Sequence, residues 1–300
     1  MHRGLSRYAR VRNDALLDGV SRMSAYLHHG MVSPQRVARE AAESNSDGAQ
    51  KYLDELLIWR ELAHGFCFYR PDHGRLGALP QWAIETLAEH QCDERPALHS
   101  WETMARAQTG DALWDAAQQS LLMHGELHNN VRMTWGKAIL NWTPDARSAL
   151  ATIVDLNHRY ALDGQDPASF GGILWCLGQF DRPFTPARPI LGTVRDRSTE
   201  QHAKRLDTVG FERKITRALV ASMPTVAVIG AGLSGLICAR TLSDHGFPVT
   251  IFEKSRGVGG RMSTRRLADG LHFDHGAQYF TTCDKRLRRL VKSWMHDGLV

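Results

Sequence analysis

Three glycines and an acid near the end of the sequence have the spacing of a dinucleotide site. Gly230, Gly232 and Gly235 form a GxGxxG pattern directly after an apolar, β-branched run, and Glu253 follows Gly235 by 18 residues. Glycines at these positions let the backbone turn tightly and bring a pyrophosphate onto the N-terminus of the next helix. A carboxylate at the end of the next strand accepts hydrogen bonds from ribose hydroxyls. The pattern predicts a nucleotide site; glycines that only permit tight packing are the alternative.

Three tryptophans in the middle of the chain have a spacing that suits either a core or an electron relay. Trp135 and Trp142 are seven residues apart, which is nearly two helical turns, so they lie on the same side of one helix. Trp114, on the preceding predicted helix, can join them. Ordinary core packing explains such a stripe equally well, because large aromatic side chains dominate protein interiors.

The elements that must position these residues are of two kinds. From residue 18 to about residue 217 the apolar residues recur at helical spacing and alternating strand patterns are nearly absent. At Met223 the pattern changes to a short strand, a glycine turn, a helix and a second strand, which is a βαβ unit. The predicted fold is mainly α, followed by a partial α/β Rossmann-type βαβ unit. The predicted domains are 1–215 and 224–300, joined by a linker at 216–223. One predicted helical face contains Leu53, Leu56, Leu57 and Leu62.

Composition excludes several classes of protein. The 300 residues are 43% hydrophobic, which is enough for a buried core, and the net charge of +5 does not by itself argue for nucleic acid. The five cysteines are scattered without CxxC spacing, so neither a disulfide framework nor a metal site is predicted. The N-terminus is charged, and no uncharged apolar run reaches the roughly 18 residues that a bilayer needs. We expect a cytoplasmic, monomeric protein that does not enter a membrane.

A second glycine-rich turn, "GVGGRMSTRR", carries Gly260 and Arg261 and is followed by "FDHGAQYFT". With the first turn, these residues resemble flavoprotein oxidoreductases of the amine-oxidase type, most closely the renalase-like branch. The resemblance implies that both turns and Glu253 hold FAD or NAD(P). It covers only residues 224–300, so the domain is expected to be incomplete. We expect no oxidase chemistry from it alone, and a second FAD or NAD(P) there only if the unit is complete.

Four collinear segments within about residues 7–212 carry another resemblance. They are "DGVSRMSAYLHHGMVSPQRVARE", "YLDELLIWRELAHGFCFY", "TGDALWDAAQQSLLMHGELHNNVRMTWGKAILNW" and "LNHRYALDGQDPASFGGILWCLG". Together they resemble the FAD-binding helical domain of DNA photolyases and cryptochromes, and the tryptophan spacing is similar to that of class II enzymes. The family's usual α/β antenna domain is not expected here. The family's "DPN" is replaced here by Asp166-Pro167-Ala168, and "HNN" at 128–130 is closer to other branches of the family.

The resemblance implies a FAD site. The turn Ser21, Arg22, Met23, Ser24 would donate to the FAD phosphates, Arg132 and Asp163 would form an ion pair beside the isoalloxazine, and Asn129 would lie near the flavin. Asn157 matches the asparagine opposite flavin N5, where an amide accepts from N5–H and favours the reduced anion. A helix-surface ion pair and a buried capping asparagine are the alternatives for Arg132–Asp163 and Asn157.

The resemblance also implies a site for damaged DNA. Glu55 would hydrogen-bond the bases of a pyrimidine dimer, Trp59 and Trp175 would form the walls, and Met133 the floor. Asp181 and Arg182 match a nearby acid–base pair, one residue closer to Trp175 than the family pattern. The family likeness favours the interpretation of Trp114, Trp135 and Trp142 as an electron relay to the flavin over mere packing.

The sequence therefore predicts light-driven repair of cyclobutane pyrimidine dimers in DNA by electron transfer from reduced FAD. Two alternatives remain. One is a FAD-dependent amine-oxidase-like or renalase-like oxidoreductase defined by residues 224–300. The other is a cryptochrome-like flavin photoreceptor without repair activity.

Overall fold

The computed structural model describes residues 2–17, 19–44, 46–216, 223–274 and 276–300. The chain divides into two compact units, which are treated separately below. Unit 1 comprises residues 1–99, 103–121 and 125–215, and unit 2 comprises residues 100–102, 122–124 and 216–300. Most of the predicted linker, residues 217–222, lies outside the described residues.

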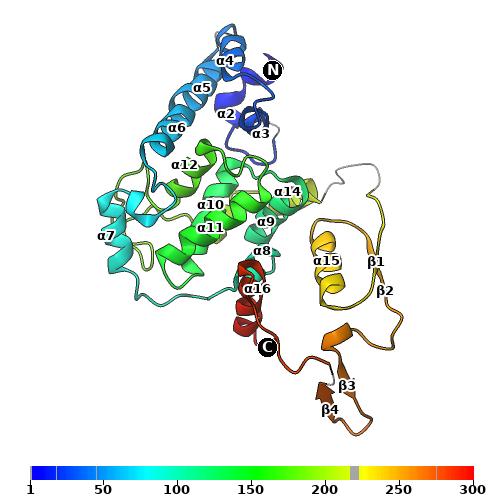
Figure 1. Ribbon diagram of the computed structural model, residues 1–300. Helices are drawn as coiled ribbons and strands as arrows, with labels where there is room; N and C mark the ends of the chain where they lie inside the picture. The colour runs from blue at the N-terminus through cyan, green and yellow to red at the C-terminus, as the bar shows by residue number, and fades with distance from the viewer. Residues whose placement is uncertain (1, 18, 45, 217–222, 275) are drawn as a thin grey trace. The chain divides into compact units, whose positions relative to one another are not determined.

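Up to residue 215, the regular elements of the described residues are all helices, as the spacing of apolar residues predicted (Figure 1). An isolated bridge pairs Arg188 with Gly192. The bounds of the helices are α1 His2–Leu5, α2 Tyr8–Val11, α3 Ser24–His28, α4 Pro34–Ala42, α5 Asp47–Asp54, the π-helix η1 Glu55–Trp59, α6 Arg60–Tyr69, the 3-10 helix η2 Leu76–Ala78, α7 Gln81–Glu89, α8 Trp101–Ala105, α9 Ala112–His124, α10 Asn129–Asn141, α11 Ala146–Tyr160, α12 Pro167–Trp175, α13 Thr199–Ala203 and α14 Thr208–Ile215.

Helices α10, α11 and α12 pack on one another in the middle of unit 1, and α12 also packs against α6. Their starts are fixed locally: Asp145 caps α11, and Asp166 caps α12 with Pro167 in its first turn. An aspartate at this position accepts from an otherwise unpaired N–H, and proline needs no N–H partner there. Most of α10 is buried, so its residues can form the floor of a site as well as the core.

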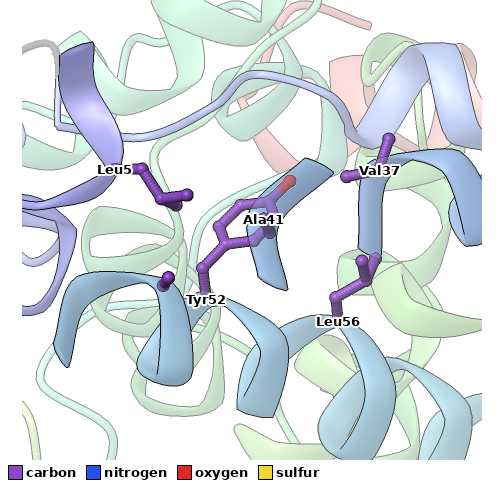
Figure 2. Close-up of a cluster of buried hydrophobic side chains, with 6 residues drawn as sticks. Leu5, Val37, Ala41, Tyr52 and Leu56 are labelled. Atoms are coloured by element: carbon purple, nitrogen blue, oxygen red, sulfur yellow. The ribbon is translucent and has the colours of Figure 1, made fainter. Parts of the chain in front are cut away.

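A cluster of six buried apolar residues holds the N-terminal helices to α5 (Figure 2). Leu5, Val37, Ala41, Ala49, Tyr52 and Leu56 are each at most 6% exposed. The cluster extends onto Leu56 in the π-helix. It therefore anchors the segment that carries Glu55 and Trp59.

The π-helix changes which leucines are buried. The backbone N–H of Arg60 donates to the carbonyl of Glu55, five residues back. The wider turn moves the following residues around the helix axis relative to an α-helical pattern. Leu56 is buried, but Leu57 is 50% and Leu62 44% exposed, so the predicted common face of the four leucines is wrong.

Unit 2 contains the predicted parallel βαβ unit (Figure 1). Its elements are β1 Val226–Ile229, α15 Leu233–Asp244, β2 Val249–Phe252, the 3-10 helix η3 Gly260–Met262, β3 Thr264–Arg266, β4 His272–Asp274 and α16 Lys285–His296. Val226 pairs with Val249 and Ile229 with Phe252, and α15 packs on both strands. β3 and β4 form an antiparallel pair. The predicted fold class, mainly α followed by a βαβ unit, is confirmed.

The described residues contain neither a membrane-spanning helix nor a cluster of metal ligands. None of the helices described is both long and apolar enough to cross a membrane. Over the same residues, no group of three or more His, Cys, Asp or Glu side chains is placed to hold a metal ion.

Candidate functional site

The predicted ion pair of Arg132 and Asp163 forms inside unit 1. Arg132, on α10, is 8% exposed, and its Nη2 lies 3.3 Å from Asp163 Oδ1. The guanidinium also donates to Ser169 Oγ at 2.8 Å and to the carbonyl of Leu127 at 3.4 Å. Its Nε is buried without a hydrogen-bond partner among the described residues. The ion pair is therefore buried and does not lie on the surface, and Arg132 Nε remains as a donor for a ligand.

Asn157, on α11, is completely buried beside this pair. Its Nδ2 donates to the carbonyl of Gly164 at 3.1 Å and to Ser169 Oγ at 2.9 Å. Its Oδ1 has no partner in the described part of the chain. An unpaired buried acceptor is costly, on the order of 1–3 kcal/mol, so the site suits a ligand that brings an N–H or O–H donor.

The predicted phosphate turn precedes the short helix α3. Ser21, Arg22 and Ser24 are exposed and Met23 is half-buried. Arg22 has a left-handed backbone, φ 54°, and its Nε donates to Glu126 at 2.9 Å. Ser21 Oγ accepts from the hydroxyl of Tyr52 at 3.3 Å, so the turn is tied to the helical core.

Asn129 is the first residue of α10 and is exposed. Its neighbour Asn130 is engaged elsewhere, since it donates to the carbonyl of Asn13 and accepts from Arg197.

Sequence reasoning missed a buried carboxylate and the basic side chains around it. Asp166 is 5% exposed and lies 3.4 Å from Arg60 Nη2 and 3.5 Å from ring nitrogens of both His28 and His64. Its Oδ1 caps α12 through the N–H of Ala168. The Asp-Pro pair before a helix signals the cap. No residue near Asp166 in the sequence indicates its partners, because they come from α3 and α6.

Ser169 was missed as well. It is buried in the first turn of α12 and accepts hydrogen bonds from both Arg132 and Asn157. It therefore joins two residues that the sequence predicted only separately.

The predicted substrate residues Glu55 and Trp59 are the first and last residues of the π-helix. Such turns are frequent at functional sites. Glu55 Oε1 lies 2.7 Å from Arg12 Nη1 and 3.0 Å from Lys51 Nζ. The carboxylate is two-thirds shielded and already paired, so a base that binds it must share it with these cations.

Trp59 and Trp175 come together from η1 and α12. Their ring centroids are 4.9 Å apart, with the planes at 40°. The rings touch and do not enclose a gap. Trp175 Nε1 donates to Asp181 Oδ2 at 3.2 Å, which fixes the tilt of its indole.

The end of α12 beneath Trp175 is held by two consecutive residues of α10. Lys137, 2% exposed, donates through Nζ to the carbonyl of Cys176 at 3.0 Å, and burial lowers the pKa of this lysine. A Cβ on Gly136 would lie 2.6 Å from Cys176 Sγ, so glycine permits the close approach. Met133, on the same helix, is half-buried and its carbonyl lies 3.9 Å from that sulfur.

Arg182 lies farther out. It is exposed, and its guanidinium carbon is 5.8 Å from the centroid of the Phe184 ring. Its backbone N–H donates to Asp181 at 3.1 Å. Asp181 thus joins Trp175 to the segment that carries Arg182.

The three candidate relay tryptophans are in contact. Trp114 and Trp135 are stacked with centroids 5.9 Å apart, and Trp142 meets Trp114 edge-on at 5.3 Å. Trp114 and Trp135 are each 1% exposed, while Trp142, directly after α10, is half-buried and contacts His99. The indoles form a continuous path from the core towards the surface of α10.

In unit 2 the two glycine turns lie against each other. Gly230 has φ 100°, and a Cβ on Gly235 would lie 1.9 Å from the carbonyl oxygen of Gly230, so both positions require glycine. A Cβ on Gly260 would lie 3.2 Å from the Cα of Gly232. By contrast, a Cβ on Gly232 would meet nothing within 4 Å. The open space lies at the N-cap of α15, where a pyrophosphate would bind.

Glu253 directly follows β2 and is tied to the first turn. Its Oε2 accepts from the N–H of Ala231 at 2.6 Å, and its Oε1 from the N–H and hydroxyl of Ser255 at 2.8 and 2.7 Å. The backbone bond to Ala231 is the largest of the contacts that lower the pKa of Glu253 to about 2. A carboxylate has about four acceptor positions, so this anion can still accept from a ribose. Arg261 is exposed, and its backbone carbonyl accepts from the N–H of Ala277 at 2.8 Å.

The helical region is similar in sequence to several proteins named deoxyribodipyrimidine photo-lyase. It is 39% identical over 188 residues to the deoxyribodipyrimidine photo-lyase of Methanothermobacter thermautotrophicus. The aligned region covers 63% of this chain and 42% of that protein. The helical region is 36% identical over 210 residues to the protein of the same name from Potorous tridactylus, and this aligned region covers 69% of this chain and 40% of the relative. The chain thus spans about two fifths of the length of these relatives.

Two further comparisons agree with this division. A crystal structure of a bacterial class III photolyase from Agrobacterium tumefaciens superposes with a TM-score of 0.50 over 71% of this chain and 41% of that one; at 18% identity this shows the fold alone. Residues 228–294 match the model of an NAD(P)-binding Rossmann-like domain. The predicted homologies, photolyase-like in the helical region and Rossmann-like after it, are both confirmed.

Proposed function

We propose that unit 1 binds FAD and uses light to split cyclobutane pyrimidine dimers in DNA. One observation carries the proposal. Inside a region homologous to photolyases, Arg132 and Asn157 are buried together, and each retains a polar atom without a hydrogen-bond partner among the residues that the structure describes. A folded chain seldom leaves such atoms unpaired unless a ligand completes them.

The donor set fits a flavin. Arg132 Nε offers a hydrogen bond from a positive charge, and Asn157 Oδ1 offers an acceptor. The Arg132–Asp163 pair places both signs of charge in a buried region, where fixed charges act strongly on the redox state of a bound group. Ser21, Arg22, Met23 and Ser24 would hold the diphosphate, and Arg60 adds a cation near the N-terminus of α12.

When bound, reduced FAD would supply, on excitation, an electron that splits the dimer and is then recovered. The chain's own residues position the DNA. Trp59 and Trp175 present a tilted aromatic surface on which flipped-out bases can stack, which offsets the few kcal/mol needed to leave the helix. Glu55 would accept hydrogen bonds from the base edges. The path Trp135–Trp114–Trp142 would carry electrons that keep the cofactor reduced.

A light sensor without repair activity is the first alternative. Glu55, Trp59 and Trp175 would serve no purpose in it, so their grouping around the π-helix and the end of α12 favours repair. Purified protein is to be mixed with DNA that contains pyrimidine dimers and exposed to blue light. Restoration of the DNA by the parent protein supports repair. A flavin-containing parent that restores none contradicts it.

A second activity is favoured by the match of residues 228–294 to an NAD(P)-binding domain. We propose that this unit binds NAD(P) or FAD through the turn at Gly230–Gly235 and through Glu253. Its alternative role, as part of an amine-oxidase-like or renalase-like oxidoreductase, requires a flavin in unit 2. Full-length Arg132→Met and Gly232→Ala variants separate the two sites. If only Arg132→Met loses the flavin, the flavin lies in unit 1. If only Gly232→Ala loses it, the oxidoreductase is favoured.

A further inference from the structure

Ser169 occupies a position between the two buried groups that face the proposed cofactor. It is the third residue of α12 and 5% exposed. Its Oγ accepts from Arg132 Nη1 at 2.8 Å and from Asn157 Nδ2 at 2.9 Å. The hydroxyl oxygen has two lone pairs, and both are used by these donors.

These contacts determine how the amide of Asn157 is turned. The carbonyl of Gly164 can only accept, so the amide atom that lies 3.1 Å from it must be the nitrogen. The second hydrogen of the same nitrogen is taken by Ser169. With both hydrogens used, Oδ1 is the one atom of the carboxamide left for a ligand, and it is the atom without a partner in the described chain.

We propose that Ser169 is a positioning residue that holds the carboxamide of Asn157 with its oxygen available to the cofactor, and so favours reduced over oxidised flavin. The chemical reason lies in N5 of the flavin, which carries a hydrogen in the reduced state and is an acceptor in the oxidised state. A fixed acceptor opposite N5 therefore stabilises the reduced flavin and destabilises the oxidised flavin. The inference rests on the proposed function, because it requires FAD in unit 1.

The test is the two-electron midpoint potential of bound flavin in the full-length protein, followed by its visible spectrum during stepwise reduction. In Ser169→Ala the amide loses one of its two anchors. We expect the preference for reduced over oxidised flavin to fall about tenfold, which moves the potential about 30 mV more negative. Ser148→Ala is the matched control, because Ser148 is half-buried on α11 and its hydroxyl donates to Asp145. It should leave the potential unchanged.

A double variant shows whether Ser169 acts through Asn157. In an Asn157→Ala background, the additional Ser169→Ala change should leave the potential where Asn157→Ala alone put it. A further shift would mean that Ser169 acts through Arg132 or by itself, and would overturn the proposal. An unchanged potential in the single Ser169→Ala variant would overturn it as well.

Ser169→Cys covers the case in which the alanine variant fails to retain flavin. Sulfur fills the site at least as well as the hydroxyl oxygen but is a weak acceptor, so the potential should again move to more negative values. An unchanged potential in this variant contradicts the role of Ser169. If the parent protein holds no flavin that Arg132→Met removes, the proposed function itself fails; if it does and only the Ser169 variants lack a shift, this inference fails alone.

Discussion

Trp114 and Trp135 are stacked with their ring planes within 10° and their centroids 5.9 Å apart, although 21 residues separate them in the sequence. The indole N–H of Trp114 donates to the backbone carbonyl of Trp135 at 2.9 Å, and that of Trp135 donates to Gln118 at 3.1 Å. Hydrogen bonds therefore fix both rings. Such a pair is suited to pass an electron, and it is equally a rigid part of the core.

Substitution of the central tryptophan separates these two roles. In Trp114→Phe the path between Trp135 and Trp142 loses its middle member, so light-driven reduction of bound flavin should slow to the level of Trp135→Phe. The lost hydrogen bond and the cavity left by the smaller ring should together cost about 2–4 kcal/mol of unfolding free energy. Both are measured on full-length protein, by flavin absorbance under blue light and by urea unfolding. Trp82→Phe, on α7, is the control; photoreduction of Trp114→Phe at the parent rate would show that the stripe only packs.

Glu55 offers a test of lesion binding. Glu55→Gln removes the negative charge that would accept from the bases, and we expect about 10–100-fold weaker binding of dimer-containing DNA. The same change breaks the contacts to Arg12 and Lys51, so Arg12→Gln serves as the matched control. This variant breaks the ion pair with Arg12, keeps the one with Lys51 and keeps the carboxylate, so lesion affinity should not fall. Equal losses in both variants would assign Glu55 to a structural role.

Loss of the buried Arg132–Asp163 ion pair should lower the free energy of unfolding far more than loss of a surface ion pair on the next helix. Asp163→Asn leaves the buried Arg132 without its countercharge, and the free energy of unfolding should fall by about 3 kcal/mol. Asp155→Asn breaks the half-exposed Asp155–Arg159 pair on α11, where a loss below about 1 kcal/mol is expected. Urea unfolding of both flavin-free variants measures the contrast. Similar losses would mean that Asp163 does not neutralise Arg132 in the core.

His128 should make the protein less stable in mild acid. Burial lowers the pKa of this histidine from 6.5 to about 4. The unfolded chain therefore binds a proton at higher pH than the folded chain, and protonation favours unfolding. Stability from this group is complete above pH 6.5 and declines as the pH falls towards 4, by about 3 kcal/mol in total.

The His128→Asn variant isolates this contribution. His128 Nδ1 accepts from the N–H of Asn130 at the start of α10, and asparagine can cap the helix in the same way without titrating. Between pH 6.5 and 4 the variant should lose less stability than the parent in urea unfolding. The same loss in both proteins would show that His128 is not responsible.

The glycine turn of unit 2 allows folding and binding to be told apart. Gly232→Ala adds a methyl group into open space, so the unit should fold normally, but the methyl group would occupy the place proposed for the pyrophosphate. Gly235→Ala places a Cβ against the Gly230 carbonyl and should disturb the turn itself. Titration with NAD(P)H and circular dichroism of full-length variants measure the two effects. Undiminished binding in Gly232→Ala would place any dinucleotide elsewhere.

The sequence by itself determined the classes of structure and the local signals. Periodicity predicted the helices and the βαβ unit. Asp145 and Asp166 cap α11 and α12, which is a role that their residue type favours locally. These features depend on neighbours within a few residues, which is the range over which backbone propensity and capping act.

Only the tertiary structure decided what the candidate residues touch. The pairing of Glu55 with Arg12, the histidines and Arg60 around Asp166, and the contact of Trp59 with Trp175 join different helices. The π-helix that exposes Leu57 was equally invisible, because one extra residue in a turn changes no local composition. Ser169 shows the reason most clearly: its role depends on two donors 37 and 12 residues away, which only the packing of α10, α11 and α12 brings within hydrogen-bonding distance.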